Sequence, residues 1–281
     1  MDKMILAGFA IVLIAGVLAG LFLVPKTSPS TENIMDKISH EGIIHACYIV
    51  YPPLVIKDPT SSEISGEMVD AFNSIAASAG WKVDYTETAW GTFIGALQSK
   101  QCDVVMNGLF AYVERAKAVS FTNPINYFGN SVLVRKGETR FNSLDDFDNP
   151  ALTIAVIQGE AGHLYAQKNL THAKLAVMSG GDISLALAQV SSGRADAAFT
   201  DAWTIEQYAK SHLETVDFLS VNPKASYGIA PVSWAVRQED QSLLVFLNNA
   251  LDVLKAEGTF HKLDEQYGAN WFYPAFELKR N

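Results

Sequence analysis

Short apolar segments alternate with amphipathic helical segments along most of this chain, and this alternation restricts the fold more than any other feature. Gly42–Val50 and Asp103–Met106 are short, apolar and rich in β-branched residues, as buried strands are. Glu67–Ala79, between them, has a helical periodicity that ends at Gly80. Strands that alternate with helices form parallel βαβ units, so the sequence predicts an α/β protein.

The same pattern continues to the end of the chain. Ala96–Gly108 and Ala186–Asp201 echo each other, since each contains a helix, a polar turn, an aspartate and an apolar strand. The echo indicates a duplicated architecture. The other predicted strands are Trp81–Thr86, Leu152–Ile157, Ala195–Phe199 and Val232–Arg237, and the other predicted helices are Trp90–Ser99, His163–Asn169, Ile183–Ser191, Leu243–Ala256 and Thr259–Tyr267.

Two connecting segments, Phe121–Gly137 and Asn222–Pro231, separate these units. Two connections fit a protein of two lobes in which the C-terminal part returns to the first lobe. We therefore predict that residues 38–127 and 231–281 form lobe 1 and residues 128–230 form lobe 2, after an N-terminal segment of residues 1–37. The stretches Asn126–Asn130 and Asn222–Ala230 should lie side by side as a hinge.

The N-terminal segment contains an unbroken uncharged run, Met4–Val24. As a helix that rises about 1.5 Å per residue, this run is long enough to cross a hydrocarbon core of about 30 Å. A Pro-, Ser- and Thr-rich tether, Pro25–Asn33, follows it, and we favour an uncleaved anchor over a signal peptide. No cysteine lies near the run, which excludes lipid attachment at a processed cysteine. We expect the chain to cross the membrane once at most.

Composition excludes several classes of function. The 281-residue chain has a formal net charge of −9 and no basic cluster, which disfavours nucleic-acid binding. No spacing of His, Cys and Asp resembles a zinc or iron site, so we predict no metal and no cofactor. Cys47 and Cys102 lie in or beside strand-like runs. We expect both to be buried free thiols, because the predicted strand order offsets them by about 10 Å or more, at roughly 3.3 Å per residue.

Two stretches carry a resemblance to a known family. Asn107–Tyr127 reads NGLFAYVERAKAVSFTNPINY, and a later helix is followed by Gly-Thr and then Lys and Tyr, in ALDVLKAEGTFHKLDEQYG. The chain resembles the bacterial extracellular solute-binding proteins of family 3, which deliver polar amino acids to ABC importers, over roughly Ile43–Tyr267. The resemblance implies a two-lobed, type II periplasmic-binding-protein-like fold outside the cytoplasm, no enzymatic activity, and an ABC permease as partner.

The resemblance also implies site residues. Arg115 aligns with the arginine that grips the ligand α-carboxylate, for which a fork of permanently charged donors is suited. Asp201 aligns with the acid that takes the ligand ammonium, although a helix N-cap role is open as well. The other implied binding residues are the aromatic walls Tyr51 and Trp90, together with Asn107, Gly108, Phe110, Glu160 and Ala161 at the strand ends.

Departures from the family pattern leave the ligand open. Phe110 and either Glu160 or Ala161 stand where the family usually has Ser or Thr. If Glu160 points inward, the pocket holds two acids against one arginine, and the ligand should carry an extra positive group, as a basic amino acid does. Two alternatives also stay open: a cyclohexadienyl-dehydratase-like enzyme that uses Glu160 as its acid, and a ligand-sensing or degenerate relative without a transport role.

Overall fold

The computed structural model describes residues 33–218 and 227–268 of the chain. The chain divides into two compact units, residues 1–33 and residues 34–281, and the elements below belong to the second unit. The predicted anchor, Met4–Val24, and nearly all of its tether lie outside the described residues. Within the described residues, no helix is long and apolar enough to span a membrane.

The described residues are organised around one mixed β-sheet, as the alternation of strands and helices predicts. Its main path runs β4-β1-β5-β12-β7-β10-β8-β9, with β6 beside β12 and β11 beside β7. The strands are β1 (Ile43–Tyr48), β4 (Lys82–Glu87), β5 (Val104–Phe110), β6 (Ser120–Phe121), β7 (Asn126–Arg135), β8 (Thr153–Ile157), β9 (Lys174–Met178), β10 (Ala197–Asp201), β11 (Val216–Phe218) and β12 (Tyr227–Val236); β2 (Ile56–Lys57) and β3 (Ile64–Ser65) form a separate hairpin.

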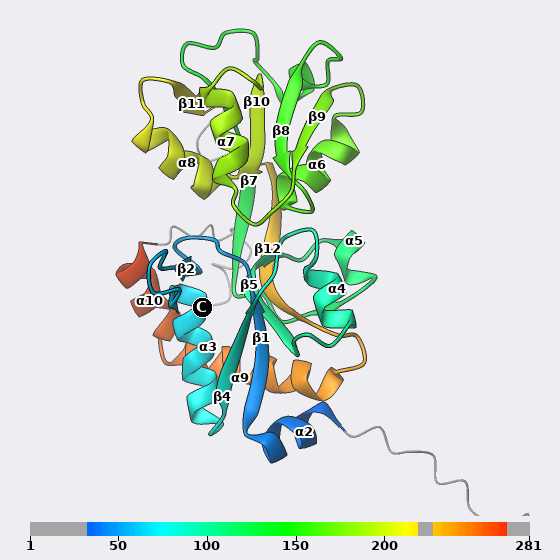
Figure 1. Ribbon diagram of the computed structural model, residues 1–281, viewed down its shortest axis with the longest axis vertical. Helices are drawn as coiled ribbons and strands as arrows, with labels where there is room; N and C mark the ends of the chain where they lie inside the picture. The colour runs from blue at the N-terminus through cyan, green and yellow to red at the C-terminus, as the bar shows by residue number, and fades with distance from the viewer. Residues whose placement is uncertain (1–32, 219–226, 269–281) are drawn as a thin grey trace, which may run out of the picture. The chain divides into compact units, whose positions relative to one another are not determined.

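The sheet has two halves, which meet where β12 pairs with β7 (Figure 1). The first half contains β4, β1, β5 and β12, and the second contains β7, β10, β8 and β9. The antiparallel register joins Asn126 to Val232 and Asn130 to Tyr227, so residues 227–230, the described part of the second predicted hinge stretch, lie beside Asn126–Asn130. Val232 also pairs with Phe110 on β5, which confirms that the chain returns to the first half. The exact lobe boundaries stay a prediction.

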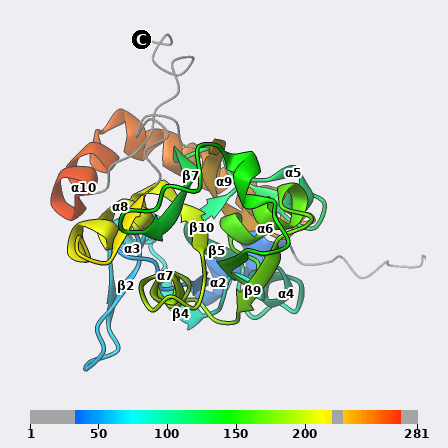
Figure 2. The same cartoon turned by 90° about the horizontal axis from the view of Figure 1, so that it is seen from above.

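Helices cover the sheet within each half. In the second half, α7 and α8 contact each other beside β7 and β10, and α6 packs on β10 and β8 (Figures 1 and 2). In the first half, α3 and α10 pack together and α4 contacts β5 (Figure 1). The helices are α2 (Ile34–Glu41), α3 (Glu67–Ser78), α4 (Phe93–Gln98), α5 (Val113–Ala116), α6 (Ala161–Asn169), α7 (Ser184–Ser191), α8 (Ala202–Ser211), α9 (Gln241–Ala256) and α10 (Thr259–Tyr267), with a 3-10 turn at Leu144–Phe147.

The prediction of two free thiols is wrong, because Cys47 and Cys102 form a buried disulfide with a Cα–Cα distance of 5.6 Å. Cys47 lies opposite Val105 in the β1–β5 pairing, so an extended chain would place Cys102 three residues away. Cys102 is not extended, however, since it lies in the turn before β5. Buried Arg237 holds that turn by donating to the carbonyl oxygens of Leu97, at 3.2 Å, and Cys102, at 2.6 Å.

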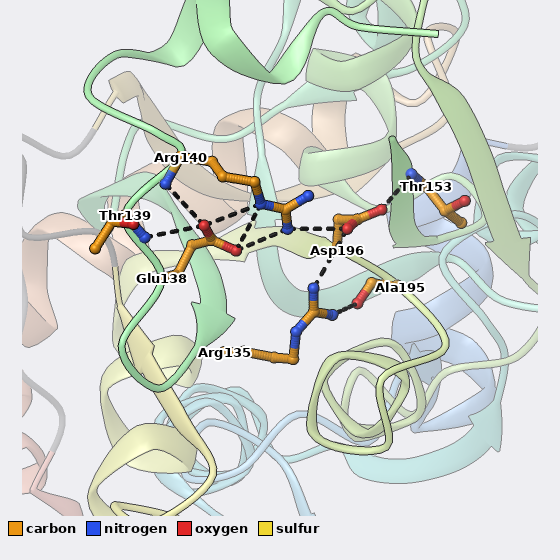
Figure 3. A network of polar contacts seen from close by, with 7 residues as sticks. All are labelled: Arg135, Glu138, Thr139, Arg140, Thr153, Ala195 and Asp196. Carbon is orange, nitrogen blue, oxygen red and sulfur yellow. Dashed lines mark hydrogen bonds and ion pairs between the residues drawn. The ribbon is translucent and has the colours of Figure 1, made fainter. Parts of the chain in front are cut away.

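A polar network ties the loop after β7 to the starts of β8 and β10 (Figure 3). The Asp196 carboxylate accepts from the Thr153 amide at 3.0 Å and pairs with Arg135 at 3.3 Å and Arg140 at 3.0 Å. Arg140 also pairs with Glu138 at 2.7 Å. Burial alone would raise the pKa of Asp196, but the Thr153 amide and the two guanidinium groups outweigh it and lower that pKa.

Candidate ligand-binding site

Four of the predicted site residues interact with one another where the two halves of the sheet meet. Tyr51, in the turn after β1, and Arg115, on α5, come from the first half. Glu160 and Asp201 come from the second half, at the ends of the loop after β8 and of β10. Charge interactions link Tyr51 to both carboxylates and Glu160 to Arg115. The prediction that these residues share one site is therefore consistent with the geometry, and their contact with a ligand stays a prediction.

The two carboxylates begin two helices. Glu160 is the N-cap of α6, and its Oε2 accepts from the Gly162 amide at 2.7 Å. Asp201 is the N-cap of α8, and its Oδ1 accepts from the Thr204 amide at 2.8 Å. Side-chain oxygens at this position satisfy backbone amides that have no partner within the helix, which explains why the sequence has acids there. The capping role foreseen for Asp201 is confirmed, and its role in binding a ligand stays a prediction.

Burial shapes the electrostatics of both acids. Only 3% of Glu160 and 1% of Asp201 is exposed. Burial, and then the nearby charge of Asp201, raises the pKa of Glu160 to about 8, although the Gly162 amide and Arg115 act against the shift. Burial likewise raises the pKa of Asp201, against hydrogen bonds from Thr204, Tyr51 and Thr200. Both carboxyl groups would be stabilised in their charged form by an added cation.

Arg115 is a buried cation that is held by backbone carbonyls. Its Nη1 donates to the Phe110 carbonyl oxygen at 2.8 Å, and its Nη2 donates to the Gly159 carbonyl oxygen at 2.6 Å. Its guanidinium carbon lies 5.4 Å from the centre of the Phe93 ring and 5.7 Å from that of Tyr112. Arg115 is not a surface residue, since only 5% of it is exposed.

The two predicted aromatic walls contact each other. Tyr51 and Trp90 are buried and make an edge-on contact with ring centres 5.3 Å apart. The Trp90 Nε1 donates to the Gly181 carbonyl oxygen at 3.0 Å, across the two halves. Burial and the charges of Asp201 and Glu160 raise the pKa of Tyr51 well above its usual range, so its hydroxyl stays a hydrogen-bond donor.

Two glycines lie where other parts of the chain come very close to the backbone, Gly159 at the contact between the two halves and Gly108 beneath Tyr51. A Cβ at Gly159, whose φ is +77°, would lie 2.6 Å from the Trp90 carbonyl oxygen and from the Gly91 Cα. A Cβ at Gly108 would lie 2.6 Å from the Leu54 side chain and 3.1 Å from the Tyr51 ring. Glycine is therefore needed at position 159, where backbone atoms fill the space, whereas a larger residue at position 108 would require the Leu54 and Tyr51 side chains to shift.

The remaining predicted residues, Asn107, Phe110 and Ala161, are buried on β5 and at the start of α6. Phe110 ends β5, and its carbonyl oxygen is used by Arg115, while its ring packs edge-on against Tyr112 at 5.8 Å. Asn107 is fully buried on β5, and neither polar atom of its amide has a hydrogen-bond partner among the described residues. Ala161 is buried at the start of α6.

The structure adds Tyr112 and Asn130, which the sequence interpretation missed. The Asn130 Nδ2 donates to the Tyr112 hydroxyl at 3.0 Å, linking the turn before α5 to β7. Burial raises the pKa of Tyr112 to about 12. A pocket of about 610 Å³ adjoins Tyr112 and extends along α6 past Leu164 and Tyr165. Tyr112 lies three residues before Arg115, so proximity in the sequence was a usable signal for it.

The chain as a whole is similar to known proteins. The profile of the bacterial extracellular solute-binding proteins, family 3, matches residues 43–270. The chain belongs to this family. A probable amino-acid ABC transporter-binding protein from Haemophilus influenzae is 26% identical over 229 residues, which are 79% of this chain and 81% of that protein. The crystal structure of an ancestral amino acid-binding protein, a precursor of cyclohexadienyl dehydratase, superposes with a TM-score of 0.73 at 30% identity, covering 84% of this chain and 99% of that one.

Family membership confirms the predicted class of fold and function: an extracytoplasmic solute-binding protein with a two-domain α/β fold. An enzyme also occurs among the relatives. A cyclohexadienyl dehydratase from Pseudomonas aeruginosa is 24% identical over 253 residues, 89% of this chain and 92% of the enzyme. The family is mainly one of binding proteins, and the dehydratase shows that the same scaffold also supports catalysis.

Proposed function

We propose that this protein captures a small amino-group-bearing solute of the amino-acid class outside the cytoplasm and delivers it to an ABC importer. The observation that carries the proposal is the buried cluster of Tyr51, Arg115, Glu160 and Asp201 at the meeting point of the two halves. In this proposal the Asp201 carboxylate binds the ligand ammonium, and Tyr51 and Trp90 form the walls. Relatives named as amino-acid-binding proteins support the class of ligand.

A ligand held by residues of both halves favours the conformation in which the halves meet, because only that conformation offers all of its contacts. The existing contacts across the halves, from Arg115 to Gly159 and from Trp90 to Gly181, show that this approach is sterically possible. We propose that residues 38–127 and 231–281 form one lobe, that residues 128–230 form the other, and that β7 and β12 form the hinge.

We further propose that Met4–Val24 anchors the protein to the outer face of the cytoplasmic membrane, with Pro25–Asn33 as the tether. The Cys47–Cys102 disulfide supports a location outside the cytoplasm, since disulfides persist in oxidising compartments. A partner permease would receive the solute from the anchored protein.

A thermal-shift screen tests the proposal. A ligand that binds only the folded protein raises the melting temperature. We expect at least one of the twenty amino acids or their amine derivatives to raise it, and a panel of sugars and dicarboxylates to leave it unchanged. Turnover of prephenate or arogenate would instead support the dehydratase alternative. A melting temperature that no amino acid or amine changes would contradict the proposal.

A further inference from the structure

The site cluster contains more acidic groups than basic ones. It holds two buried carboxylates, Glu160 and Asp201, and one buried guanidinium, Arg115. Within residues 33–218 and 227–268, no Lys, Arg or His nitrogen lies within 4.0 Å of either carboxylate. The buried Asp103 carboxylate, by contrast, lies 3.1 Å from Arg237. Buried charges are normally paired, so the cluster favours a cationic ligand.

Two groups in the cluster have the chemistry to bind a ligand carboxylate. One is the guanidinium of Arg115, and the other is the set of backbone amides at the N-terminus of α6, where the helix dipole favours an anion. Any carboxylate that uses both groups must come close to Glu160, which begins that helix and interacts electrostatically with Arg115.

Both groups are already engaged by the protein itself. The Gly162 amide donates to Glu160 at 2.7 Å, and the Ala161 amide also stabilises the charged form of that carboxyl group. Arg115 donates to the carbonyl oxygens of Phe110 and Gly159. Glu160 thus places a carboxylate of the protein at the anion-binding end of α6, with Arg115 as its nearby countercharge.

We infer that Glu160 takes the place of a ligand carboxylate, so that the preferred ligand is a cationic amine without a carboxylate group. This inference rests on the proposed function, because it concerns the same site and the same class of solute. Asp201 would bind one ammonium, and this cation would stabilise the charged form of Glu160. The charged Glu160 would then repel a carboxylate on the ligand. Tyr51 and Tyr112, which interact with Glu160, add ring faces and hydroxyl groups suited to an ammonium.

The electrostatic surroundings of Glu160 support this assignment. The charged and titratable groups that face it or adjoin it are Asp201, Arg115, Tyr51, Tyr112 and His163. His163 accepts from the Gly159 amide through Nδ1, and burial lowers its pKa, so it adds no positive charge near neutral pH. A bound cation would therefore be the main new partner of Glu160 and Asp201.

Calorimetry with matched pairs tests the inference. Each pair joins an amino acid to its decarboxylated amine: arginine and agmatine, lysine and cadaverine, ornithine and putrescine. We expect the wild-type protein to bind the amine of at least one pair at least about tenfold more tightly than the amino acid, because like charges in a buried site cost more than this. Glu160→Gln, which keeps a side-chain oxygen for the α6 cap, should shrink or reverse that ratio.

The outcomes separate the two claims. If the wild-type protein binds the amino acids more tightly than the amines, or if Glu160→Gln leaves the ratio unchanged, the inference is overturned and the proposed function stands. If neither these pairs nor any other amino acid binds the wild-type protein, the proposed function fails and the inference fails with it. The wild-type ratio needs no variant, so a poorly folded Glu160→Gln protein would not remove the test.

Discussion

Removing the disulfide should destabilise this protein by an amount that follows from the loop it closes. Cys47 and Cys102 are separated by 55 positions. The chain-entropy relation gives about 14 cal/mol/K for a loop of this length, or about 4 kcal/mol at 25 °C. For a protein of this size, such a loss lowers the melting temperature by roughly 8–16 °C. We expect Cys47→Ala/Cys102→Ala to show this decrease in urea denaturation and in thermal unfolding.

Reduced wild-type protein is the matched control for the double variant. Both lack the cross-link, but only the alanine variant also loses two buried sulfur atoms, so its stability should be equal or lower. Titration of thiols in denatured, unreduced wild-type protein should find none. Two titratable thiols, or a double variant less than about 1 kcal/mol below the oxidised protein, would refute the reasoning from loop closure.

Two further predictions concern single carboxylates. Asp196→Ala removes the acceptor shared by Thr153, Arg135 and Arg140, and should lower the free energy of unfolding in a urea titration by about 2–3 kcal/mol. The control, Asp217→Ala, removes an exposed ion pair with Lys136 and should lower it by less than about 1 kcal/mol. Equal losses would contradict the role of the network. Since the pKa of Glu160 is raised to about 8, the folded protein retains a proton that the unfolded chain releases near its ordinary pKa. Wild-type stability should therefore fall relative to Glu160→Gln as the pH rises from about 5 to 8, by up to about 1.4 kcal/mol per pH unit, and a difference that does not change with pH would contradict the shift.

Much of the fold was predictable because its signals are local. Apolar runs such as Leu152–Ile157 fixed strand positions to within a residue or two, and β8 is Thr153–Ile157. Gly258 lies between the predicted helices Leu243–Ala256 and Thr259–Tyr267, and it has a left-handed φ of +70°, as a glycine that ends a helix commonly does. The pairing of β7 with β12 was also predictable, because two connections between two lobes must run together.

Features that depend on the tertiary path of the chain were not predictable in the same way. The disulfide was missed because the turn before β5 is set by Arg237, which is more than a hundred residues away in the sequence. The extent of β5 was underestimated, since the strand continues through Gly108 to Phe110 beneath Tyr51.

In the candidate site, too, some residues could be predicted from the sequence and others depend on the tertiary path of the chain. Asp201 and Glu160 were predicted from the resemblance to the family and from their places after apolar strands, but their burial and their shared surroundings came only from the fold. Asn130 was missed because nothing in the local sequence indicates that an asparagine on β7 meets a tyrosine before α5, whereas Tyr112 could have been found from its closeness to Arg115 in the sequence.

Calorimetric titration of Asp201→Asn, with the best ligand from the thermal-shift screen, tests the central claim most directly. Asparagine keeps a side-chain oxygen for the α8 cap, so the fold should be retained while the charge that binds the ammonium is lost. Asp217→Asn serves as the control for removing one carboxylate elsewhere. We predict that Asp201→Asn weakens binding by at least about 30-fold and that Asp217→Asn leaves it unchanged. Wild-type affinity in Asp201→Asn would contradict the account.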